Sequence, residues 1–270
     1  MQKPLESFYE KYYASFAFSS VTVTPISIET LEMSTYLFQG LVHPERAQIS
    51  LQCSFEFTHF TTSEQATARI SIVLNQVAVW VDTNIVWDIH DLRNVVKAMV
   101  SHELEVVGFI KGLAYDVEIR RVLNPEHEVD YVFGVEIPCI ADRNKGIDLS
   151  ARASEIRSKT NGDEGVFLHR CFADLVSAMK NADDTGFYCY RAVESLRQHC
   201  IVKFDLDPAK KDEQWAKVRK LSGCTEEVLR EIKTAADAAR HGEVVKITSE
   251  QRQRLFLITW DVVDGYLASV

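Results

Sequence analysis

The sequence lacks the short motifs that mark several common enzyme classes. It has no glycine-rich phosphate-binding loop, no Gly-x-Ser-x-Gly elbow and no His-Glu-x-x-His zinc motif. No stretch approaches the roughly 18 uninterrupted apolar residues that a membrane helix needs. The opening residues, MQKPLESFYEKYYASF, carry charges and no apolar core, so we expect no signal peptide. We therefore expect a cytoplasmic protein with no membrane contact.

Cysteine spacing of the kind found in zinc sites and redox pairs is also absent. The six cysteines stand at positions 53, 139, 171, 189, 200 and 224, and none forms a Cys-x-x-Cys pair. Histidines lie beside cysteines only in His199–Cys200 and in His169–x–Cys171. We expect reduced, mostly buried thiols, and neither a metal nor another cofactor.

Positive charge is scarce in the first half of the chain. Residues 1–150 carry 11 basic and 20 acidic residues, whereas residues 151–270 carry 19 of each. Neither half therefore has the basic surface typical of strong, sequence-independent nucleic-acid binding, and RNA contact is left to a small local patch. The length of 270 residues, with 46% hydrophobic and 26% charged residues, suits one large or two medium globular domains.

The first half shows the period of two that predicts strands. In AQISLQCSFEFT (47–58) apolar and polar residues alternate, and TARISIVLNQVAVWVD (67–82) continues with β-branched residues. We expect these two segments to pair antiparallel, with a break near Asn75. SVTVTPISIE (20–29) is a further candidate strand, and Pro25 favours an edge position for it.

A helical period replaces the alternation in residues 88–112, where Gly112 is a suitable stop. Two more strands are predicted at 114–124 and 129–140. The first domain, residues 1–140, is therefore predicted as α+β, with a mainly antiparallel sheet and one long helix. Residues 141–164 are polar and short of large apolar side chains, so we interpret them as a linker between domains.

Residues 165–270 are predicted to form a helical bundle. In the helix expected at 186–204, Cys189, Val193, Leu196 and Cys200 make one apolar stripe. The helix at 225–242 begins with Thr225 as a predicted N-cap and ends with Arg240, His241 and Gly242.

The last predicted helix, 248–270, opens with Thr248 and Gln251 at the spacing of a capping box. Its apolar residues from Leu255 to Tyr266 cover more than one face. Such a helix is either central in a bundle or buried against a second subunit, and we expect a homodimer through this bundle.

The order of these helices resembles the HEPN-like helical domains of prokaryotic proteins. The resemblance covers about residues 165–270 and is carried by FYCYRAVESLRQ, a Trp-containing basic helix, LREIKTAADAARHGEV and TSEQRQRLFLITWDVVDGYL. It implies a compact, frequently dimeric bundle, and many proteins of this type act in toxin–antitoxin and anti-phage systems as metal-independent RNases. The first half resembles only the sheet-containing parts of uncharacterised bacterial proteins that carry such tails.

The active motif of that family is not reproduced in this chain. The motif has an Arg, a polar residue and then a His a few positions later, but positions 234–236 hold Thr234, Ala235 and Ala236. Arg240 is adjacent to His241, which is too close for the motif. Arg191 and His199 are farther apart than usual, and on one helix they would not converge on one phosphate.

A cluster of Asp237, Arg240 and His241 is the candidate catalytic site. RNA cleavage without metal needs a general base, a proton donor and a cation, which His and Arg can supply, and Asp237 lies one turn before His241 and can orient it. The structural interpretation is equally coherent, because basic residues and a glycine commonly end a helix. Arg191 and Glu194 form either a solvated ion pair or, as possible helpers of the site, an inter-helix or inter-subunit contact to Asp237 or His241.

Three functional hypotheses follow. The first is a HEPN-like binding and assembly protein without catalysis, with a sensor or partner-binding sheet domain, in prokaryotic stress or anti-phage defence. The second is a metal-independent RNase toxin or effector that uses residues around Arg240–His241. The third, a small-molecule enzyme with its site between the domains, has no specific support. The incomplete motif and the acidic balance favour the first.

Overall fold

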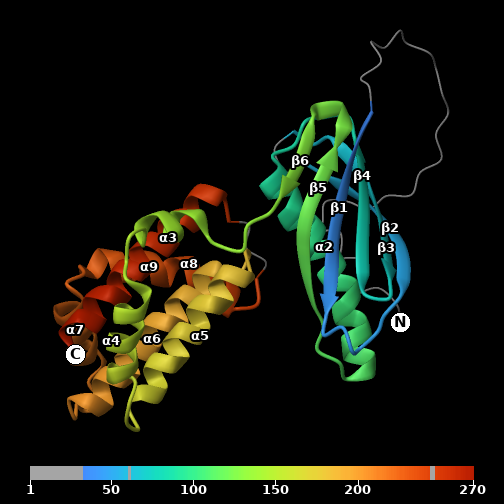
Figure 1. The fold of residues 1–270 in the computed structure, drawn as a ribbon. Coiled ribbons are helices and arrows are strands. Elements are labelled where there is room, and N and C mark those ends of the chain that lie inside the picture. The colour runs from blue at the N-terminus through green and yellow to red at the C-terminus, as the bar shows by residue number, and fades with distance from the viewer. Residues whose placement is uncertain (1–32, 60–61, 244–246) are drawn as a thin grey trace, which may run out of the picture. The chain divides into compact units, whose positions relative to one another are not determined.

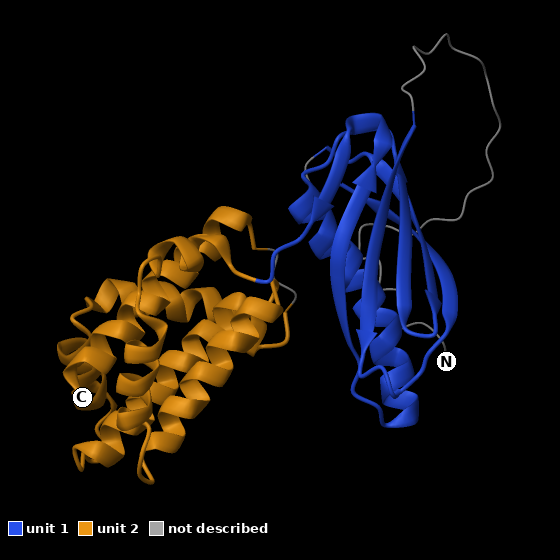
Figure 2. Ribbon diagram, in the orientation of Figure 1, with its two compact units in different colours: residues 1–135 blue, residues 136–270 orange. Residues whose placement is uncertain are grey.

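A computed structural model describes residues 33–59, 62–243 and 247–270 of the protein. The chain forms two compact units, residues 1–135 and residues 136–270 (Figure 2). Unit 1 contains an antiparallel sheet and one long helix, and unit 2 is helical, so the predicted α+β class is confirmed. In the described part of the chain, no helix is both long enough and apolar enough to span a membrane.

Unit 1 is built on a six-stranded sheet in which every neighbouring pair of strands is antiparallel (Figure 1). The strand order is β2-β3-β4-β1-β5-β6. The strands are β1 (Ser34–His43), β2 (Leu51–Thr58), β3 (Gln65–Val73), β4 (Gln76–Thr83), β5 (Asp116–Asn124) and β6 (Val129–Val132). The predicted strands near 47–58, 67–82 and 114–124 are confirmed, and the segment 20–29 lies outside the described residues.

The sequence analysis missed β1, which lies in the middle of the sheet between β4 and β5. Its residues Tyr36, Phe38 and Val42 are buried on the helix-covered face, but Gly40 and Leu41 are buried as well. A Cβ on Gly40 would stand 2.3 Å from the backbone oxygen of Glu118 on β5. This close approach requires a glycine in the strand. The glycine and the buried Leu41 together interrupt the alternation of apolar and polar residues by which a strand is identified in a sequence.

The break predicted near Asn75 is the tight turn between β3 and β4. Leu74 and Asn75 have φ values of 46° and 70°, the left-handed geometry that a two-residue hairpin turn needs. The Asn75 side chain accepts a hydrogen bond from the backbone of Ile49, at 2.9 Å, and donates to the carbonyl of Val42, at 3.0 Å. One buried side chain therefore ties this turn to the end of β1 and to the segment before β2.

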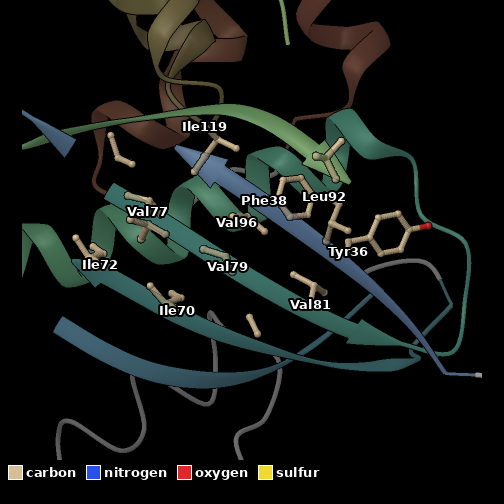
Figure 3. Close-up of a cluster of buried hydrophobic side chains, with 14 of the residues drawn as sticks. Tyr36, Phe38, Ile70, Ile72, Val77, Val79, Val81, Leu92, Val96 and Ile119 are labelled. Carbon is tan, nitrogen blue, oxygen red and sulfur yellow. The ribbon is translucent and has the colours of Figure 1, made fainter. Parts of the chain in front are cut away.

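The predicted long helix is α2 (Ile89–Lys111), and its ends are as expected. Asp88 caps the N-terminus by accepting from two backbone amides, and Gly112 ends the helix with a φ of 68°. The buried stripe of α2 packs on the sheet, and Figure 3 shows two of its members, Leu92 and Val96, beside the strand residues of the same core. This apolar layer between one helix and one face of the sheet is the core of unit 1.

The strand predicted over 129–140 is too long. β6 ends at Val132, and Pro138 begins a short helix, α3 (Pro138–Arg143). Proline suits the first turn of a helix, where no backbone N–H is needed, and it has no N–H for a strand ladder.

Unit 2 contains seven helices within the described residues. They are α3, α4 (Leu149–Lys159), α5 (Gly165–Lys180), α6 (Thr185–Lys203), α7 (Lys211–Ser222), α8 (Glu226–Arg240) and α9 (Ser249–Ser269). The predicted stripe on α6 is confirmed, because Cys189, Val193, Leu196 and Cys200 are all buried. A Cβ on Gly186 would stand 2.4 Å from the carbonyl oxygen of Ala235, so this glycine lets α6 and α8 pack in close contact.

The polar linker predicted at 141–164 needs correction, because this segment belongs to the bundle. It contains the end of α3 and all of α4, and the boundary between the units lies at 135–136. Arg143 binds Asp261 and Asp264 of α9, at 2.8 and 2.6 Å, and Arg152 binds Asp264 at 2.8 Å. The segment is polar because it packs on α9 mainly through ion pairs, with few apolar residues such as Ile156 against the core.

Helix α9 is confirmed as a two-sided apolar helix with the predicted capping box of Thr248 and Gln251. Its buried side chains include Phe256, Val263 and Tyr266. The neighbouring helices of the same chain cover most of this surface. Of the two alternatives, a central helix and a helix buried against a second subunit, the structure therefore shows the first. The two-sided pattern therefore needs no second subunit to explain it, and the homodimer stays a prediction.

Candidate functional site

The candidate residues Asp237, Arg240 and His241 lie at the end of α8. Thr225 caps the start of this helix, as predicted, by accepting from the backbone of Val228. At the other end, the backbone amides of Gly242 and Glu243 donate to the carbonyls of Ala239 and Ala238. This is a Schellman motif with Gly242 at a φ of 79°. His241 is therefore the C-cap residue, one position beyond the final turn in which it was expected.

Among the described residues, the Arg240 side chain contacts Asp237 and Tyr190 and not His241. The guanidinium lies 3.3 Å from the carboxylate of Asp237 and stands over the ring of Tyr190, 5.3 Å from its centroid. Asp237 therefore orients Arg240, whereas the sequence analysis assigned it to His241. His241 is exposed, and among the described residues no hydrogen bond or ion pair joins it to Asp237 or Arg240. The structure does not assemble the three residues around one point.

Tyr190 of α6 connects Arg240 to a second cation. Its ring stacks on Trp215 of α7 with centroids 6.4 Å apart, and Arg197 stands over Trp215 at 4.9 Å. Burial and a nearby Glu194 raise the pKa of the Tyr190 hydroxyl, while Arg240 and Arg197 act in the opposite direction. These contacts form a row, Arg197–Trp215–Tyr190–Arg240, that spans α6, α7 and α8.

The row also defines what Tyr190 and Glu194 do in the bundle. Tyr190 is only 7% exposed, so it is a packing residue and its ring is not free to stack on a base. The Glu194 carboxylate raises the pKa of the Tyr190 hydroxyl, and it does not pair with Arg191. Trp215 and Arg197 were missed, because partners on different helices have no fixed spacing in the sequence.

Arg191 pairs with a buried carboxylate on another helix. Its guanidinium lies 3.1 Å from Asp174 of α5, and its plane stands near the rings of Phe187 and Tyr188. Asp174 is 4% exposed, and burial raises its pKa, opposed by Arg191 and Arg170. Within the single chain Arg191 therefore contacts Asp174 and neither Asp237 nor His241, and a contact to these residues across two subunits stays a prediction. Asp174 was missed, although a carboxylate among the apolar positions of α5 is a signal that the sequence contains.

His199 is the one buried histidine of the bundle, and it is not beside the candidate cluster. Its Nδ1 lies 2.8 Å from the hydroxyl of Tyr266 on α9, and burial together with Lys203 lowers its pKa to about 4. The neighbouring thiol of Cys200 is buried too, and burial raises its pKa. A neutral histidine and protonated thiols are packing groups here, with low reactivity as nucleophiles. Among the described residues, no group of three or more His, Cys, Asp or Glu side chains could hold a metal ion.

The arrangement at the end of α8 can cap a helix and hold a cation on the surface. A general base must lie within hydrogen-bond reach of the proton that it removes and close to the cation that stabilises the transition state. Arg240 is held by Asp237 and Tyr190, and His241 stands apart on the surface. The geometry is that of a helix end with a surface ion pair.

Comparison with protein-family models gives a match in each unit. Residues 36–133 match the model described as Domain of unknown function (DUF8168) N-terminal domain, and residues 153–270 match the corresponding C-terminal domain. No curated protein and no solved structure matches the chain. The chain is therefore similar to the N-terminal domain of that pair in unit 1 and to the C-terminal domain in unit 2.

Proposed function

We propose that this protein is a HEPN-like binding and assembly protein, dimeric and without nuclease activity, whose sheet unit binds a protein partner. The resemblance of residues 165–270 to HEPN-like domains supports a role in prokaryotic stress or anti-phage defence. The observation that carries the proposal is the engagement of Arg240 by Asp237 and Tyr190, away from His241.

This engagement opposes catalysis for a physical reason. A nuclease arginine must meet the developing charge on the phosphate, and a histidine must reach the ribose hydroxyl at the same moment. Turning Arg240 toward His241 would break its ion pair with Asp237 and remove it from the ring of Tyr190. Each contact is weak, about 1 kcal/mol or less, but both favour the non-catalytic position.

The assembly part of the proposal is supported by exposed apolar side chains in unit 1. Val106, Phe109 and Ile110 of α2 are 47%, 90% and 73% exposed. Large apolar side chains grouped on one surface are a feature of protein–protein contacts. The acidic balance of residues 1–150 makes nucleic acid the less suitable partner for this unit.

The test is an RNA-cleavage assay on the purified full-length chain with labelled single-stranded RNA and excess chelator. We expect no cleavage above the buffer control from the wild type, from His241→Ala or from His169→Ala. His169 is the matched control, because it is an exposed histidine on α5. Expression of the wild type in bacteria is expected to leave growth unchanged.

A different result would favour the alternative function, a metal-independent RNase. Metal-independent cleavage that is lost in His241→Ala and kept in His169→Ala would make the protein an RNase toxin or effector. In that case Asp237→Asn should also reduce the rate, because an active site of this kind needs the Asp237 carboxylate to orient the His241 imidazole.

A further inference from the structure

We propose that two copies of this chain associate through the edge of β2 that no described strand covers, pairing antiparallel about a two-fold axis at Ser54 and joining their sheets. The inference rests on the assembly role proposed above and names the surface and the partner. Two identical antiparallel strands meet around a two-fold axis, so this contact closes as a dimer.

This edge of β2 has few of the features by which sheet edges avoid pairing. Within the described residues β2 is hydrogen-bonded to β3 alone, in one uninterrupted register from Leu51–Ile72 to Thr58–Gln65. Its sequence, LQCSFEFT, contains no proline, no lysine and no arginine, and its only charge is Glu56. Protected edges commonly carry such residues, or a bulge, or are very short. An edge of this length and composition favours pairing with another strand.

The side chains of β2 complement a second copy of themselves in this register. Side chains alternate between the two faces of a strand, and residues directly opposite each other point to the same face. The apolar faces of the two copies therefore lie on the same side only if the two-fold axis passes at a residue and not between two residues. With the axis at Ser54, two pairs form on the helix-covered face, Leu51 with Phe57 and Cys53 with Phe55. On the other face Gln52 lies opposite Glu56, so the two Glu56 carboxylates do not oppose each other.

Apolar surface remains to be covered beside this edge. Leu51, Cys53, Phe55 and Phe57 are only partly buried in the single chain. Burial, together with the carboxylate of Glu103 on α2, raises the pKa of the Cys53 thiol.

Val106 and Ile110 follow Glu103 at three and seven positions, on the same flank of the helix. They are 47% and 73% exposed. A partner strand laid along β2 would cover the apolar side chains of β2 that the single chain leaves partly exposed.

The mass of the full-length chain in solution is the first test. We expect light scattering to give about twice the chain mass of 30.7 kDa at micromolar concentration. Ser54→Glu should weaken the dimer by roughly tenfold or more, because two like charges would then oppose each other at the axis. The new carboxylate should be tolerated in the single chain, because Ser54 is exposed and lies opposite Arg69 of β3.

Cross-linking tests the register. In a Cys53→Ser background, Ser54→Cys should form a covalent dimer under mild oxidation, because the two thiols face each other across the axis. Ser71→Cys is the matched control: Ser71 lies on the same face one strand inward, opposite Gln52 of its own chain, and should not cross-link.

The proposal is overturned by a monomeric wild type, by a Ser54→Glu variant that stays dimeric with an unchanged urea midpoint, or by equal cross-linking at both positions. A dimer that persists in Ser54→Glu would place the contact elsewhere, such as on the bundle. None of these outcomes depends on RNA cleavage, so failure of this inference and failure of the non-catalytic proposal remain distinguishable.

Discussion

Asn75 has two separate functions in unit 1, and each can be measured. Its φ of 70° is costly for most residues, and its side chain bonds to Ile49, Val42 and Pro44. The backbone requirement explains an asparagine or a glycine in this turn, but only asparagine supplies the three hydrogen bonds.

We expect Asn75→Gly and Asn75→Ala both to lower the free energy of unfolding, by different amounts. Losing the side chain leaves buried backbone groups without partners, at about 1–3 kcal/mol. Alanine adds the left-handed strain of about 1 kcal/mol that glycine avoids. Urea unfolding at neutral pH measures both losses. Equal losses in the two variants would show that the backbone conformation contributes nothing.

His199 predicts how the stability of the bundle depends on pH. In the folded chain the pKa of His199 is about 4, lowered by burial and by Lys203, whereas the ordinary value is 6.5. Below pH 6.5 the unfolded chain therefore binds a proton that the folded chain does not bind. The stability present above pH 6.5 is lost as the pH falls toward 4, by about 3 kcal/mol in total.

The measurement is urea unfolding from pH 7.5 to 4.5. His199→Gln should remove much of the acid-side loss, whereas His169→Gln, which changes an exposed histidine, should keep the wild-type slope. Identical slopes for the two variants would mean that His199 is not the titrating group.

Helices α5 and α6 are joined by an ion pair whose acid is buried. Asp174 of α5 is 4% exposed, and one of its oxygens has no hydrogen-bond partner among the described residues. Burial raises its pKa, and Arg191 of α6 offsets part of that cost. The pair therefore specifies how the two helices meet but adds little net stability.

A double-mutant cycle separates these contributions. Arg191→Met alone should cost about 2 kcal/mol or more, because it leaves a buried carboxylate uncompensated. Asp174→Leu with Arg191→Met should recover most of that loss, because no buried charge remains. Thermal and urea unfolding of the single and double variants give the coupling. A double variant as unstable as Arg191→Met would count against this account.

The helix ends contrast with this ion pair, because each end is specified within a few residues. Thr225, Thr248 and Asp88 cap their helices by accepting hydrogen bonds from amides two or three positions ahead. Gly112 and Gly242 supply the left-handed residue beyond the other ends. Such ends are predictable from the sequence, since all the atoms involved lie within one turn.

The division of the molecule at 135–136 leads to a prediction for fragments of the bundle. A fragment of residues 136–270 keeps α3, α4 and their ion pairs to Asp261 and Asp264, whereas residues 165–270 lose them. We expect the longer fragment to unfold cooperatively and at the higher temperature. Calorimetry on both fragments measures the difference, and equal melting temperatures would restore the interpretation of 141–164 as a linker.

Limited proteolysis of the full chain gives a second measurement of the same boundary. Val135 is 90% exposed, whereas α4 is held to α9 by Arg152 and by the bonds of Lys159 to backbone carbonyls. The first cut should therefore fall near 133–137. A first cut within 149–159 would contradict the packing of α4.

The sequence by itself determined the local features of this protein: the alternation of β2, the period of α2, the caps of α8 and α9, and the α+β class. Each depends on contacts within one or two turns or on one repeating pattern, which a sequence displays directly. The lack of an Arg–polar–His spacing before His241 was readable for the same reason, because that spacing lies within one segment.

Only the tertiary structure decided which side chains meet across segments. It put β1 in the middle of the sheet, α3 and α4 on α9, and Arg240 over Tyr190 instead of beside His241. It also paired Arg191 with Asp174 and His199 with Tyr266. These partners lie on separate elements, and the packing of helices and strands, which no local period encodes, sets which of them come within contact distance.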